Sequence, residues 1–113
     1  MLVEETLDLT VEELYEKIGQ EMSVGVGLGE VEPEEYENRG RRWLNKYRQK
    51  LQETICKSQV AKVTLYKNRT WDQTLLIAAI ADLLASLSLG VSPVVVAALL
   101  VKEGLSQLCL END

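Results

Sequence analysis

Few residues in this chain of 113 amino acids could carry out chemistry. The chain contains no histidine, which is the commonest general base in enzymes and a frequent zinc ligand. The Ser-His and Cys-His designs for nucleophilic catalysis are therefore excluded. Two separate cysteines cannot form a structural zinc site without carboxylate ligands. No group of nucleophile, base and orienting residue remains, so we expect no enzymatic activity, no catalytic or metal site and no cofactor.

The two cysteines, Cys56 and Cys109, are far apart in the sequence. The N-terminus has no basic segment followed by a cleavage site, so we expect no signal peptide and a cytoplasmic location. In a reducing compartment the two thiols would be buried and reduced. The alternative is a disulfide that links the middle of the chain to its C-terminal region.

Glycines at positions 25, 27 and 29 suggest a phosphate-binding loop, but their spacing does not fit one. Dinucleotide loops require G-x-G-x-x-G, and the next position here is Glu30. The Walker lysine is absent, and the neighbouring carboxylates would repel a phosphate group. We therefore expect residues 23–32 to form a flexible acidic linker. The other acidic residues do not match a calcium-loop spacing and are expected to be solvated.

The net charge of −6 conceals a strong segregation along the chain. Residues 1–38 hold twelve acidic side chains and one basic one, whereas residues 39–69 hold ten basic side chains and one acidic one. Residues 70–113 hold five acidic side chains and one basic one. Such blocks can neutralise each other within a compact fold or across an oligomer, or they can be presented to partners.

Residues 33–57 are predicted to form an amphipathic helix that begins at Pro33. Gly40 lies within its apolar stripe, and a glycine there predicts the close approach of another element. One flank is the candidate basic surface: Arg39, Arg42, Lys46 and Lys50. Basic residues near Trp43 and Tyr47 could indicate nucleic-acid binding, but both aromatic residues lie on the apolar stripe. We therefore keep nucleic-acid binding only as an alternative.

Capping signals place the other helices. Thr10 and Glu13 form a capping box before a helix at 11–22, and Ser58 can cap a short helix at 59–66. Thr70 and Gln73 form a second capping box before a helix at 71–89. A turn with Gly90, Ser92 and Pro93 then leads into a helix at 93–110.

The last two helices are expected to form an apolar hairpin. The second arm is apolar on both sides in its first two turns, so it has more apolar surface than a small monomer would cover. This excess predicts an interaction surface at Val95, Val96, Leu99 and Leu100 and favours a homodimer. Each arm is too short or too interrupted to span a bilayer, so a membrane-active hairpin remains a secondary alternative.

Asp82 interrupts the first arm and is the candidate buried polar residue. A carboxylate in an apolar helix is unfavourable unless it is paired or reaches water. We expect Asp82 to lie on a narrow polar sector with Asp72 and Ser86, where it would meet water or a basic side chain of residues 33–57. The alternative is a role in partner recognition or acid–base chemistry.

These observations predict a single helical domain over residues 1–113, all-α, with four to five helices in a compact bundle. The expected function is a non-enzymatic protein–protein interaction module, an adaptor or regulatory subunit that self-associates through the hairpin. Its other protein partner is not specified by the sequence.

Overall fold

The computed structural model describes residues 2–22, 32–61 and 72–109, which are helical without any β-strand. This part of the chain confirms the prediction of an all-α fold. Nearly all of the Gly-rich segment, Thr70 and residues 62–66 of the predicted short helix lie outside the described residues. The helices are α1 (Val3–Thr6), α2 (Val11–Met22), α3 (Pro33–Ile55), α5 (Gln73–Ala85), α6 (Pro93–Glu103) and α7 (Leu105–Cys109).

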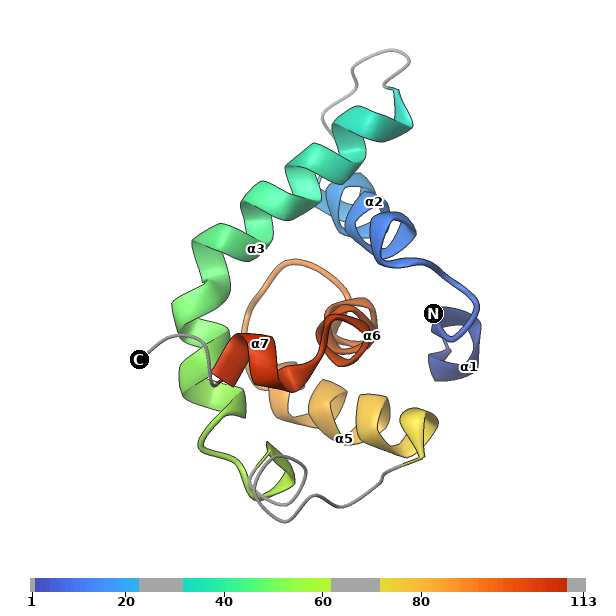
Figure 1. Ribbon diagram of the computed structural model, residues 1–113. Coiled ribbons are helices and arrows are strands. Elements are labelled where there is room, and N and C mark those ends of the chain that lie inside the picture. The colour runs from blue at the N-terminus through green and yellow to red at the C-terminus, as the bar shows by residue number, and fades with distance from the viewer. Residues whose placement is uncertain (1, 23–31, 62–71, 110–113) are drawn as a thin grey trace.

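Helix α6 lies at the centre of the molecule, and the other helices surround it (Figure 1). It begins where the sequence predicts, with Ser92 as its N-cap and Pro93 in its first turn. The Ser92 Oγ accepts a hydrogen bond from the Val95 N–H at 3.5 Å. Its residues 95–100 are all buried. This stretch has no polar side chain, and it is stable in this position because the surrounding helices cover it.

The predicted capping box is confirmed at the start of α2. The Thr10 N–H donates to the Glu13 carboxylate at 2.9 Å, and the Glu13 N–H donates to the Thr10 Oγ1 at 3.1 Å.

Helices α2 and α3 pack at very close range. Gly40 of α3 faces the backbone of Tyr15, and Gly19 of α2 faces the backbone of Tyr36. The close approach predicted at Gly40 is therefore confirmed, and a second glycine makes the matching contact.

Helix α5 is shorter than residues 71–89. Its N-cap is Asp72, whose carboxylate accepts hydrogen bonds from the N–H groups of Thr74 and Leu75 at 2.9 and 3.3 Å. It ends at Ala85, and Leu89 is buried from the following loop, not from a helix. Gly90 adopts the positive φ expected of it, +78°, within that loop. Apolar residues alone did not distinguish the loop from a continued helix.

The last predicted helix is divided at Gly104, whose φ is +99°. This left-handed conformation favours glycine and ends α6, and α7 follows directly. At the other end of the chain, α1 is a single turn in which the Leu2 N–H donates to the Glu5 carboxylate at 3.2 Å. Four residues are too few to produce a periodic pattern, so this helix was not predicted.

Candidate interaction surface

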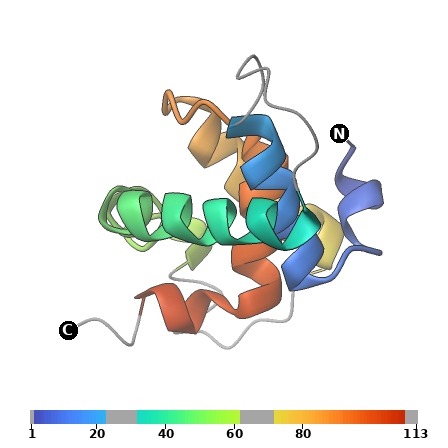
Figure 2. The ribbon, with the colours of Figure 1, turned by 90° about the horizontal axis from the view of Figure 1, so that it is seen from above.

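Helix α3 lies at one edge of the molecule (Figures 1 and 2), and its outward side is polar. Its inner side packs into the core through Gly40, Trp43, Leu44, Leu51 and Ile55, all of which are buried. On the opposite side, the exposed residues between positions 38 and 50 are basic or amide-bearing, and the exposed carboxylate of Glu53 follows one turn later, where it accepts a hydrogen bond from Gln49. These basic and amide-bearing residues are Asn38, Arg42, Asn45, Lys46, Gln49 and Lys50.

Arg42, Lys46 and Lys50 form what we call the basic row. They are exposed and follow each other at intervals of four residues, so they lie on successive turns of one helix face. Like charges at this spacing destabilise a helix by about 0.2–0.5 kcal/mol per pair. The Lys46 ammonium lies 5.6 Å from the centre of the Tyr47 ring, within range of a cation–π contact. Among the described residues, no carboxylate lies within ion-pair distance of any member of the row.

Arg39, the fourth predicted member of the basic surface, differs from the row. Its guanidinium is 3.0 Å from the Glu35 carboxylate and 5.9 Å from the centre of the Tyr36 ring. Only 21% of its side chain is exposed. Arg41, on the other flank, forms a similar ion pair with Glu37 at 2.9 Å. Both arginines are therefore engaged within the chain.

Tyr15 joins three helices through its phenol group. Its hydroxyl donates a hydrogen bond to the Glu103 carboxylate of α6, and the Arg41 guanidinium of α3 lies 4.3 Å from the centre of its ring. Burial raises the pKa of Tyr15 above its usual range, and the Glu103 hydrogen bond and charge raise the pKa further. The phenol therefore stays neutral and acts as a tie between helices. Tyr15 lies beside the buried residues Leu14 and Ile18 in α2, and nothing in the local sequence indicates its partner 88 positions away.

The predicted apolar interaction surface is wrong as an exposed surface. Val95, Val96, Leu99 and Leu100 are between 0 and 3% exposed, so they belong to the core of a single chain. The helices around α6 cover both of its sides, which removes the excess apolar area on which the prediction depended. These residues are not available to a second molecule in this structure.

Asp82 is exposed on α5, so it is not a buried polar residue, whereas the expectation that it lies on a polar sector and meets water agrees with the structure. The narrow polar sector of this helix, with Asp72, Asp82 and Ser86, faces solvent. The Asp82 carboxylate therefore reaches water and needs no basic partner. Burial of α5 on its other side is sufficient to explain its apolar composition, because Leu76, Ile77, Ile80, Ala81 and Leu84 are buried there.

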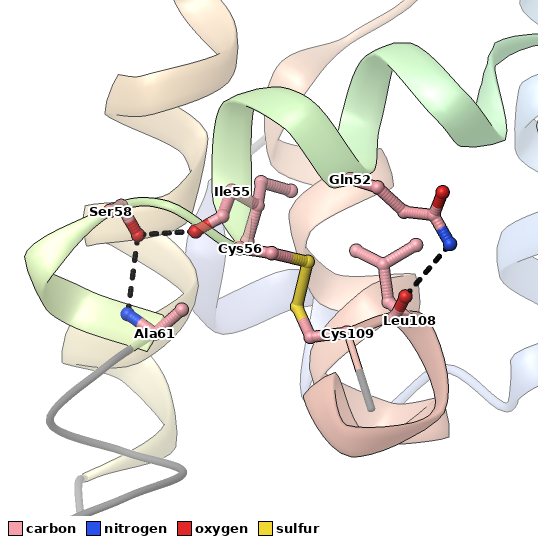
Figure 3. The surroundings of a disulfide bond; sticks show 7 residues. All are labelled: Gln52, Ile55, Cys56, Ser58, Ala61, Leu108 and Cys109. Carbon is pink, nitrogen blue, oxygen red and sulfur yellow. Dashed lines mark hydrogen bonds between the residues drawn. A yellow bond between two sulfur atoms is a disulfide. The ribbon is translucent and has the colours of Figure 1, made fainter. Parts of the chain in front are cut away.

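The two cysteines are joined in a disulfide at the far end of α3 (Figure 3). Cys56 is the C-cap of α3 and Cys109 is the last residue of α7, with their Cα atoms 5.5 Å apart. Beside them, the Gln52 side-chain amide donates a hydrogen bond to the Leu108 carbonyl at 2.9 Å. The expectation of two reduced thiols is therefore corrected. Disulfides persist mainly in oxidising compartments, so this bond does not favour the cytoplasmic expectation, which rested on the N-terminal sequence alone.

Comparisons with protein-family models, with curated proteins and with solved structures found no match for this chain. No described helix combines the length and the apolar character needed to cross a membrane. The described residues also contain no group of three or more potential metal ligands. The basic row is thus the feature on which an interpretation of function can be built.

Proposed function

We propose that this chain is a non-enzymatic protein–protein interaction module, an adaptor or regulatory subunit, that uses the basic row of α3 to bind an acidic protein surface. The observation that supports this proposal is the position of Arg42, Lys46 and Lys50. Three like charges lie together and exposed, and none of them has an ion-pair partner among the described residues. Their mutual repulsion is relieved when carboxylates of a partner approach.

The rigidity of α3 favours such a contact. Its inner side is held by the core, its middle approaches α2 at Gly40, and its end is joined to α7 by the disulfide. A helix that is ordered before binding loses less conformational entropy in the complex. The exposed amides of Asn38 and Asn45 can add hydrogen bonds to carboxylates or backbone groups, whereas the Gln49 amide donates to the Glu53 carboxylate at 3.4 Å.

A pair of double variants tests this proposal. Lys46→Gln/Lys50→Gln removes two charges from the basic row, whereas Lys17→Gln/Lys57→Gln removes the same charge elsewhere. Each tagged protein is used for affinity capture from the native cells, followed by quantitative mass spectrometry. Some proteins should be captured equally by the wild type and by the control. We expect the captured amount of these proteins to be about tenfold lower with Lys46→Gln/Lys50→Gln. Equal capture by both variants would exclude the basic row as the contact surface.

Nucleic-acid binding is a second candidate because the same face combines cations with amides, which both contact phosphate groups. The net charge of −6 opposes it, since the whole chain repels a polyanion. Fluorescence anisotropy with labelled DNA and RNA, single- and double-stranded, compares the two functions. At about 0.15 M salt we expect no saturable binding. Saturable binding with a steep salt dependence, lost in Lys46→Gln/Lys50→Gln, would select nucleic acid instead.

A further inference from the structure

We infer that the acidic surface recognised by the basic row is carried by a second copy of this chain, so that copies associate head to tail. This inference rests on the proposed function of the row and specifies its partner. The contact joins α3 of one molecule to the N-terminal segment of the next.

The N-terminal segment provides a surface of the required charge. Helix α1, the turn after it and the first turn of α2 carry five exposed carboxylates and no basic residue. We call this set the acidic face: Glu4, Glu5, Asp8, Glu12 and Glu13. The Glu5 carboxylate also accepts a hydrogen bond from the Leu2 backbone N–H, and the Glu13 carboxylate accepts one from the Thr10 backbone N–H. The side chains of Glu4, Asp8 and Glu12 form no hydrogen bond and no ion pair with another described residue.

The two charged surfaces do not neutralise each other within one molecule. The ion pairs among the described residues, Glu35–Arg39 and Glu37–Arg41, both lie within α3. Neither uses a carboxylate of the acidic face or a cation of the basic row. Lys102 of α6 reaches the N-terminal segment, where its ammonium donates to the Leu7 carbonyl at 2.8 Å, but it forms no ion pair with a described carboxylate. The charges of the described acidic face and basic row are therefore left for contacts between molecules.

The arrangement of the helices determines the kind of association. Helix α1 and the C-terminal half of α3 lie at opposite edges of the molecule in both views, and α6 lies between α1 and α3 (Figures 1 and 2). In a closed two-fold dimer, each copy would have to offer both surfaces on one side. Glu12 and Glu13 lie on α2, which packs against α3, but the acidic residues of α1 and the lysines in the C-terminal half of α3 lie at opposite edges. Such surfaces give a heterologous contact that leaves one surface free at each end, so that further copies can add.

Sedimentation velocity over a concentration series at low salt tests the inference. The wild type and the control Lys57→Gln are expected to grow beyond a dimer as concentration rises, and about 1 M salt should return them to monomer. Lys46→Gln/Lys50→Gln lacks the basic row, and Asp8→Asn/Glu12→Gln lacks two charges of the acidic face. Each variant alone should associate about tenfold more weakly than the wild type.

Mixing the two variants provides the decisive measurement. Each retains the surface that the other lacks, so an equimolar mixture should form a dimer with one good contact and should stop there. Its formation would also show that both variants are folded. A wild type that stays monomeric, a dimer that does not grow, or a mixture that stays monomeric would each overturn the inference. Those results leave the capture experiment above as the separate test of whether the basic row binds another protein.

Discussion

Gly40 shows how one residue determines the distance between two helices. A methyl group at this position would overlap the Tyr15 carbonyl group of α2, and one at Gly19 would overlap the Tyr36 carbonyl group of α3. Each glycine therefore lets the opposite backbone come into contact. The sequence predicted this role for Gly40 because a glycine within an apolar helical stripe is otherwise unfavourable. Gly19 follows the apolar residue Ile18 near the end of α2, where a glycine carries a weaker signal.

We predict that Gly40→Ala destabilises the protein by about 2–3 kcal/mol. Alanine is favoured over glycine within a helix by about 1 kcal/mol, but the added methyl group would force apart two packed backbones. Chemical denaturation followed by circular dichroism measures the change. Gly90→Ala is the control, because no atom lies within 4 Å of the added carbon and only its positive φ opposes the change. A Gly40→Ala protein as stable as the wild type would contradict the close packing of α2 and α3.

The neutral phenol of Tyr15 predicts a loss of stability at alkaline pH. Its pKa is raised in the folded state, so the folded chain retains the proton where the unfolded chain releases it. The contribution of this residue is therefore complete below pH ~10, the ordinary pKa of tyrosine, and is lost as the pH rises toward the folded value.

The variant Tyr15→Phe isolates this effect from other groups that titrate in the same range. At neutral pH it should lower the free energy of unfolding by about 1–2 kcal/mol, since the Glu103 carboxylate loses its donor. Denaturation curves at several pH values should then show a smaller loss of stability above pH ~10 than in the wild type. An identical alkaline loss in both proteins would show that Tyr15 does not cause it.

At the scale of the elements, α7 depends on the disulfide. This helix has five residues, Leu105–Cys109, and is too short to be stable alone. Its buried residues Leu105 and Leu108 and the Gln52 hydrogen bond hold it against the molecule, and the link from Cys109 to Cys56 fixes its end. The sequence could not determine this pairing, because two cysteines in one chain are equally compatible with free thiols.

We predict that Cys109→Ser lowers the free energy of unfolding by up to about 4 kcal/mol, because the bond closes a segment of 53 residues that is otherwise free in the unfolded chain. Hydrogen exchange should increase most in α7. Cys56→Ser/Cys109→Ser is the matched control and should behave like the single variant. Mass analysis of the unreduced wild type should show the loss of two hydrogens. A wild type that retains both free thiols would contradict this prediction.

The ends of the helices show a division between local and distant causes. Thr10 with Glu13, and Ser92 with Pro93, were identified from the sequence because caps involve residues within about four positions of each other. The N-cap of α5 is Asp72, whereas the sequence predicted Thr70. Gly104 ended α6 although apolar residues continue beyond it. In each of these two cases a neighbouring residue offered a competing local conformation that the apolar pattern did not reveal.

At the scale of the whole molecule, the position of α6 accounts for the largest difference between expectation and structure. Its apolar surface on both sides was interpreted as a contact for a second copy. The surrounding helices of the same chain cover that surface instead, so Val95, Val96, Leu99 and Leu100 are core residues. The proposed self-association through the charged surfaces involves the outside of the molecule and leaves this core intact.

The sequence by itself determined the helical class, the amphipathic character of α3, two of the caps, the close approach at Gly40 and the segregation of charge. All of these depend on residue types and on spacing within a few turns. Only the tertiary structure decided that α6 is enclosed, that Asp82 faces water and that Cys56 meets Cys109. It also placed α3 and α1 at opposite edges (Figure 1). These features depend on which distant segments pack together, and the spacing of residues along one helix does not specify its neighbours.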